Sequence, residues 1–114
     1  MERILHLLTE LNEVTGAILV GKDGLIVSGT LHSDDEEVLG AMAAAAFGSV
    51  TNFTEQIKNG DMKHTIIETQ TGTIQLAEVG ELILVVVTQR PSNLGRVRIE
   101  MKKASRQLLE MVAG

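Results

Sequence analysis

Two strand-length segments without a polar face constrain the fold of this chain more than any other feature. Residues 14–20 contain one polar side chain, Thr15, and residues 82–87 contain none. A strand with one face in water alternates apolar and polar residues, so both segments are expected to be buried on both faces. They therefore predict the centre of a sheet that is covered by helices on both sides.

The remaining segments complete an α/β (α+β) chain in the order α-β-β-α-β-β-β-α. Amphipathic or capped segments predict helices at residues 2–12, 33 to about 58, and 93 to about 112. Strands are expected at residues 14–20, 25–28, 63–69, 73–79 and 82–87. Short turns make the sequential strands antiparallel. The sequence thus predicts one domain over residues 1–114, with a central five-stranded antiparallel sheet and helices on both faces.

Capping residues mark the ends of the two longer helices. Ser33 can cap the second helix, and Glu36 can complete a capping box. Asn59-Gly60 predicts the end of that helix, and either Ser92 or Asn93 can cap the last one.

The second predicted helix has an unusual composition. Seven of the nine residues at 40–48 are Gly or Ala, and no charged residue occurs between Glu37 and Glu55. A helix that lies on a sheet with its outer side in water would carry charge there. The other two helices are needed for the opposite sheet face, and the loops are too short to cover much. We therefore expect a second copy of the chain to cover this helix, through contacts at Met42, Ala45, Ala46, Ser49, Val50 and Phe53.

The predicted strand at 63–69 begins the last three-stranded segment, so one of its edges can be free. A free edge is a template for pairing with another chain, here favoured to be a second copy through Ile66 and Glu68. The polar residues Lys63, His64 and Glu68 are equally typical of residues that prevent such pairing.

The composition argues against nucleic acids and membranes as partners. The net charge is −5, and aromatic residues make up only 2% of the chain, which disfavours phosphate contacts and base stacking. No apolar run approaches the roughly 20 residues that span a bilayer. Without a signal-peptide pattern at its start, the protein is expected to be cytoplasmic.

The sequence lacks the residue patterns of catalytic and metal-binding sites. The chain has no cysteine, and His6, His32 and His64 lack metal-ligand spacing. The acidic run at 34–37 is typical of a helix N-terminus. The turn at 21–24 lacks the spacing of a phosphate-binding loop. The sequence thus predicts no enzymatic activity, no cofactor and no metal.

Several stretches together resemble the Roadblock/LC7 family, and most closely its compact prokaryotic members of the MglB type. They are Val14-Thr15-Gly16-Ala17-Ile18-Leu19-Val20, Lys22-Asp23-Gly24-Leu25-Ile26-Val27, Leu39-Gly40-Ala41-Met42-Ala43-Ala44-Ala45, Gly72-Thr73-Ile74, Val79-Gly80 and Asn93-Leu94-Gly95-Arg96-Val97-Arg98. Their order and element context are more specific than any one of them.

The resemblance implies a profilin/longin-like fold and a homodimer in which the second helices pair and the sheets join at their edges. It also implies a scaffold or regulator of a Ras-like small GTPase, acting as an adaptor or as a GTPase-activating co-factor. The GTPase surface is expected at the exposed residues Asn52 and Gln56. Two alternatives are a motor or signalling adaptor without GTPase activation and a small-molecule-sensing profilin-like domain.

Overall fold

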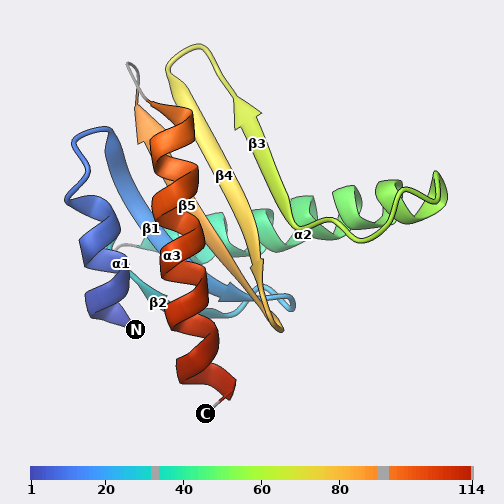
Figure 1. Ribbon diagram of the computed structural model, residues 1–114, viewed down its shortest axis with the longest axis horizontal. Coiled ribbons are helices and arrows are strands. Elements are labelled where there is room, and N and C mark those ends of the chain that lie inside the picture. The colour runs from blue at the N-terminus through green and yellow to red at the C-terminus, as the bar shows by residue number, and fades with distance from the viewer. Residues whose placement is uncertain (32–33, 90–92, 114) are drawn as a thin grey trace.

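Five antiparallel strands form one sheet in the order β2-β1-β5-β4-β3 (Figure 1). The computed structural model describes residues 1–31, 34–89 and 93–113. The strands are β1 (Val14–Gly21), β2 (Ile26–Gly29), β3 (His64–Glu68), β4 (Gly72–Val79) and β5 (Leu82–Gln89). The helices are α1 (Glu2–Thr9), α2 (Asp34–Gln56) and α3 (Leu94–Ala113). The predicted element order is confirmed.

The two apolar strands lie inside the sheet, as predicted. β5 is the central strand, between β1 and β4, and Ile18 of β1 lies opposite Val85 of β5. The side chains from Ile83 to Val86 are fully buried, although they point alternately to the two faces. Two-sided burial of β5 requires an apolar layer on each face of the sheet.

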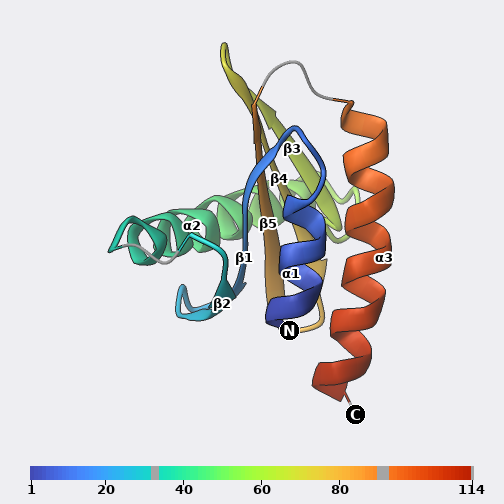
Figure 2. The same cartoon turned by 90° about the vertical axis from the view of Figure 1, so that its left-hand side faces the viewer.

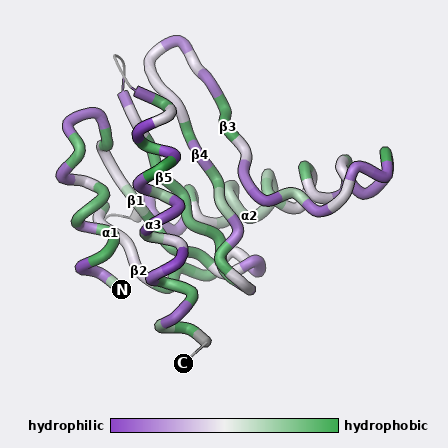
Figure 3. The backbone as a smooth tube through the Cα atoms, in the orientation of Figure 1, coloured by the Kyte–Doolittle hydropathy of each residue, from purple (hydrophilic) through white to green (hydrophobic). Residues whose placement is uncertain are grey.

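Helices supply these two layers from opposite sides (Figure 2). One core cluster joins the sheet to α1 and α3, and the buried residues of α3 in it are Val97, Met101, Ala104 and Leu108. Figure 3 shows hydrophilic and hydrophobic residues alternating along α3, as expected for a helix with one buried face. The second cluster joins the other face to Ala43 and Phe47 of α2. α2 is thus the single helix on its face among the described elements.

The strand β4 is buried on its polar side as well as on its apolar side. Thr73 and Gln75 face α3 and are buried, which the alternating sequence pattern did not reveal. The hydroxyl of Thr73 hydrogen-bonds that of Thr88 at 2.5 Å, and Gln75 Oε1 accepts a bond from Nε2 of His64 at 2.7 Å. Polar pairs therefore replace apolar packing at this end of the α3 layer.

The helix ends differ from the predicted ones by a few residues. α1 ends at Thr9 rather than near residue 12. Asn93 caps α3 as one of the two predicted alternatives, since its Oδ1 accepts a bond from the Arg96 N–H at 3.0 Å. The carboxylate of Glu36 accepts a hydrogen bond from the Leu31 N–H at 3.0 Å. Ser33, Ser92 and His32 lie outside the described residues.

The second helix ends at Gln56, because the first residue after it with a left-handed conformation is Lys58 and not Gly60. Lys58 adopts the left-handed conformation with φ of 57°. Its N–H donates to Glu55 O at 3.0 Å, and the Asn59 N–H donates to Thr54 O at 2.9 Å. These bonds form a Schellman motif with lysine at the position that glycine usually occupies.

None of the helices in the described ranges is both long enough and apolar enough to cross a membrane.

We expect Lys58→Gly to stabilise the fold by about 0.5–1 kcal/mol. Glycine avoids the clash of a β-carbon in the left-handed conformation, and part of the gain is lost to unfolded-state entropy. Urea denaturation measures the change. Asn59→Gly is the matched control and is expected to be neutral or destabilising, because Asn59 is not left-handed. Equal stabilisation by both changes would contradict this account.

Candidate protein interfaces and the pocket beside α2

One flank of α2 presents apolar and small side chains to solvent. The predicted contact residues Met42, Ala45, Ser49 and Phe53 follow one another at intervals of three or four, so they share a helix face. All four are exposed, Met42 by 65% and Phe53 by 62%. Large apolar side chains left this open on a helical segment without charge, as between Glu37 and Glu55, are typical of an interaction surface.

The other two predicted contact residues, Ala46 and Val50, sit closer to the sheet. Both are half-buried and pack against the core cluster beneath α2. They lie where the exposed flank meets the sheet, so they can contribute to both layers.

The two glycines of α2 have different surroundings. A β-carbon placed on Gly40 would lie 2.5 Å from Ile26 Cδ1 and 3.4 Å from Gly24 O, so this glycine allows the β1–β2 turn to approach the helix. A β-carbon on Gly48 would meet nothing within 4 Å. Glycine inside a helix costs about 1 kcal/mol relative to alanine. No contact within the chain explains the glycine at position 48.

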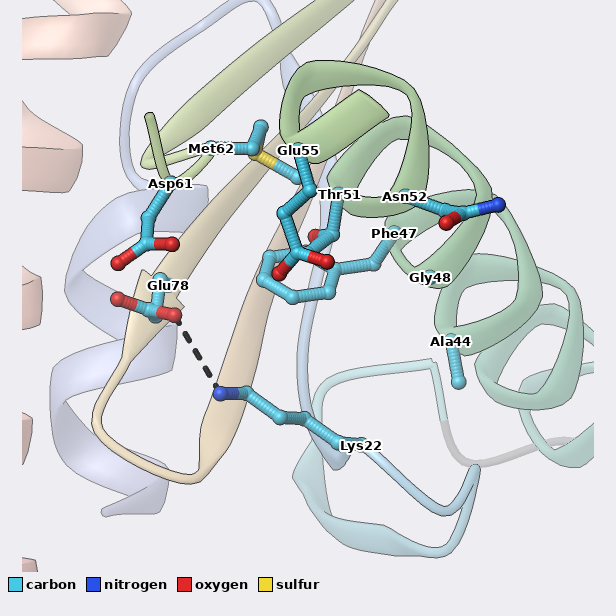
Figure 4. A pocket seen from close by; sticks show the side chains of 10 residues that line it. All are labelled: Lys22, Ala44, Phe47, Gly48, Thr51, Asn52, Glu55, Asp61, Met62 and Glu78. Atoms are coloured by element: carbon cyan, nitrogen blue, oxygen red, sulfur yellow. Dashed lines mark hydrogen bonds and ion pairs between the residues drawn. The ribbon is translucent and has the colours of Figure 1, made fainter. Parts of the chain in front are cut away.

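A pocket of about 400 Å³ lies on the opposite flank of α2 (Figure 4). Residues 44, 48, 51 and 55 form its helical wall, again at intervals of three or four. The complete lining is Lys22, Ala44, Phe47, Gly48, Thr51, Asn52, Glu55, Asp61, Met62 and Glu78. The pocket therefore brings together the β1–β2 turn, α2, the segment before β3 and the end of β4. Of the two predicted partner residues, Asn52 lines it, whereas Gln56 is exposed at the end of α2 and does not.

The charges at this pocket are partly paired. Glu78 accepts from Lys63 Nζ at 3.0 Å and from Lys22 Nζ at 3.3 Å. The hydrogen bond from Lys63, helped by Lys22, holds the pKa of Glu78 below its usual value, and the same bond raises the pKa of Lys63. The ammonium of Lys22 also lies 5.7 Å from the centre of the Phe47 ring, within cation–π range.

The strand β3 has a free edge. Among the described strands it pairs with β4 alone. Lys63 O accepts from the Glu78 N–H at 3.0 Å, and the Thr69 N–H donates to Gly72 O at 2.8 Å. Odd-numbered residues thus direct their backbone groups at β4, and the alternation of an antiparallel ladder directs those of His64, Ile66 and Glu68 outward.

The histidine at this edge has a perturbed environment. His64 is half-buried on the α3 side of the sheet, where Nε2 bonds Gln75. Burial lowers the pKa of His64, and the nearby charges of Arg98 and Lys102 on α3 lower it further; the bond to Gln75 acts in the opposite direction. The neutral ring is therefore favoured in the isolated chain.

The described residues contain no group of three His, Asp or Glu side chains that could hold a metal ion.

Most of the pocket could not be found from the sequence. Lys22, Asp61, Met62 and Glu78 come from separate segments, and no spacing pattern links them. The interior glycine at position 48 was the one local signal, and it could not be told apart from the other small residues of α2.

The fold agrees with the comparisons to known proteins. The sequence profile of the Roadblock/LC7 domain matches residues 1–88. The chain belongs to the Roadblock/LC7 family. It is also 39% identical over 112 residues to each of two uncharacterized Methanocaldococcus jannaschii proteins, MJ1340 and MJ0310, covering 97% of this chain and 98% of each relative.

Solved structures share the fold of this Roadblock/LC7 chain at low sequence identity. A Roadblock/LC7 domain from Streptomyces avermitilis superposes with a TM-score of 0.95 at 18% identity, covering 100% of this chain and 98% of that one. Myxococcus xanthus MglB gives 0.91 at 23% identity, covering 98% and 94%. Acanthamoeba castellanii profilin IB gives 0.71 at 14% identity, covering 96% and 97%. The predicted profilin-like Roadblock fold is confirmed.

Proposed function

We propose that this chain is a non-enzymatic homodimeric scaffold that regulates a Ras-like small GTPase. The observation that carries the proposal is the uncharged outer flank of α2, on which Met42 and Phe53 are more than half exposed. Membership of the Roadblock/LC7 family supports a binding role. Residues 1–114 act together as one Roadblock/LC7 unit in this proposal.

Two surfaces of the chain are available for the same second copy. A two-fold axis perpendicular to the sheet and centred on Ile66 would continue the sheet from β3 into β3 of the second copy. The same axis would leave both α2 helices on one face of the joined sheet, running antiparallel. The exposed flank of α2 could then pack against the same flank of α2 in the second copy, because α2 extends past the β3 edge of the sheet (Figure 1).

The backbone geometry of β3 allows several registers for this pairing, and we infer the one centred on Ile66 because it also places opposite charges across from each other. His64, Ile66 and Glu68 have outward backbone groups, so Ile66 would lie opposite Ile66 of the partner subunit. His64 would then lie opposite Glu68 of the partner subunit, with both side chains on the α3 side of the sheet. Residues that exchange both backbone bonds have Cα atoms about 5.5 Å apart, close enough for opposite charges to interact.

The GTPase half of the proposal rests on the likeness to MglB-type proteins. Asn52 and Gln56 are the proposed GTPase contacts, and both are exposed near the C-terminal end of α2. The small-molecule-sensor alternative would need a buried polar pocket. The buried hydroxyls of Thr73 and Thr88 instead bond each other, and Gln75 Oε1 bonds His64, which does not favour that alternative; Gln75 Nε2 has no partner among the described residues.

Met42→Arg is expected to weaken self-association by about 100-fold or more, because an unpaired charge buried at an interface costs about 3–5 kcal/mol. Light scattering or analytical ultracentrifugation over a concentration series measures it. Gln107→Arg is the matched control, since it makes the same change in charge at an exposed position of α3, which packs on the other face of the sheet. A monomeric native chain at micromolar concentration would refute the dimer, and equal effects of both variants would refute the assigned flank.

Self-association is expected to tighten as the pH falls from about 7.5 to about 6. The pKa of His64 is below its usual value in the separate chain, and Glu68 of the partner subunit would raise it on association. Association then takes up protons, and this contribution is lost as the pH rises through the raised pKa. Two symmetric pairs, each worth roughly 0.2–1 kcal/mol, correspond to about 2- to 30-fold.

The pH series needs two variants and one precaution. His64→Gln and Glu68→Gln should each abolish the pH dependence while Gln75, Arg98 and Lys102 remain in place around position 64. Because the lowered pKa makes the folded chain less stable below about pH 6.5, circular dichroism must show that the chain stays folded. A pH dependence that persists in Glu68→Gln would rule out this register.

A pull-down with Ras-like GTPases from the source organism, loaded with GDP or a GTP analogue, tests the partner. We expect one nucleotide state to be enriched. Asn52→Ala/Gln56→Ala should weaken capture by about 30-fold, because two truncations that cost about 1 kcal/mol each add to about 2 kcal/mol. The dimer mass is measured in parallel, because Gln56 lies three residues after Phe53 of the contact flank. Enrichment of neither state would refute the GTPase role, and capture of a motor or signalling protein alone would support the adaptor alternative.

A further inference from the structure

The pocket beside α2 combines an apolar floor with charged walls (Figure 4). Phe47 and Met62 form the floor and are buried. Glu55, Asp61 and Glu78 contribute carboxylates from three different segments of the chain. This combination suits a group that has both an apolar stem and a positive charge.

The three carboxylates are not equally used within the chain. Glu78 already pairs with Lys22 and Lys63. Glu55 and Asp61 form no ion pair within residues 1–31, 34–89 and 93–113. Three carboxylates at the pocket thus stand against two lysines, Lys22 and Lys63, so a net negative charge remains, although Asp61 also attracts Lys63.

The pocket already holds one cation that belongs to the chain itself. Lys22 places its ammonium group between the Phe47 ring and the Glu78 carboxylate. An aromatic face and a carboxylate at this separation attract a cation more strongly than either does alone. Elsewhere in the pocket, the carboxylates of Glu55 and Asp61 again border the apolar floor.

Two further features of this flank have no explanation inside the chain. The hydroxyl oxygen of Thr51 is buried and has no hydrogen-bond partner, which is unfavourable unless a donor is supplied from outside. Gly48 weakens the helix at the edge of the pocket, although nothing lies within 4 Å of where its β-carbon would be. Both are accounted for if another molecule enters here.

We propose that this pocket binds a basic side chain, arginine or lysine, presented by a protein partner. The aliphatic stem would lie on Phe47 and Met62, and the charged end would pair with Glu55 and Asp61. The pocket stays open in the proposed dimer, because it lies on the flank of α2 opposite Met42 and Phe53. One part of this inference rests on the proposed function, namely that the basic side chain belongs to a protein. The link is Asn52, which lines the pocket and is also a proposed partner contact.

An NMR titration of the full chain with Nα-acetyl-arginine methylamide tests the charge chemistry directly. We expect saturable amide shifts confined to residues 44–62, to the turn that carries Lys22 and to the end of β4 at Glu78. The citrulline counterpart has nearly the same shape without the charge and should cause at least 10-fold smaller shifts. Nα-acetyl-lysine methylamide should bind the same residues.

Variants assign the effect to the acidic wall. Glu55→Gln/Asp61→Asn should weaken arginine binding at least fivefold, whereas Glu37→Gln/Glu110→Gln, with the same change in net charge, should leave it unchanged. Equal shifts with citrulline, or equal loss in both double variants, would overturn the proposal. Putrescine binding more than 10-fold tighter than the arginine probe would assign the pocket to a free polyamine instead, and would also overturn it.

Light scattering on the same samples separates this inference from the dimer. Loss of the dimer with intact arginine binding would count against the proposed function alone. Intact dimerisation without charge-specific binding would count against the pocket alone.

Discussion

The burial of β5 on both faces is the constraint on which the rest of the molecule depends. Each face of this strand needs an apolar layer, and the chain has three helices to supply both. α1 and α3 share one face, so α2 covers the other by itself. That division leaves one helix with a long side that no other described element covers, and both proposed binding surfaces follow from it.

The two flanks of α2 differ in chemistry although they belong to the same helix. One carries exposed Met42 and Phe53 without a nearby charge, which suits an identical apolar surface. The other borders a pocket where Glu55 and Asp61 meet the buried ring of Phe47. A symmetric dimer on one flank and a basic partner on the other would use the helix without competition between them.

Local signals explain why much of the fold was predictable. Runs without a polar face marked β1 and β5, and the absence of charge between Glu37 and Glu55 marked the outer side of α2. The end of α2 was placed two residues late, because Lys58 adopts a conformation that its residue type disfavours and no local pattern reports. Gln75 alternates in the sequence with the apolar residues Ile74 and Leu76, yet its side chain is fully buried in the structure.

The sequence by itself determined the element order, the central strands and the uncharged segment of α2, because periodicity and composition are properties of neighbouring residues. Tertiary structure alone decided the pocket and the role of the free edge. Lys22, Phe47, Asp61 and Glu78 meet only after the sheet and α2 have packed. The outward backbone groups of β3 depend on its register with β4, which hydrogen bonds across the sheet establish. Contacts between residues far apart in the chain have no local pattern from which they can be read.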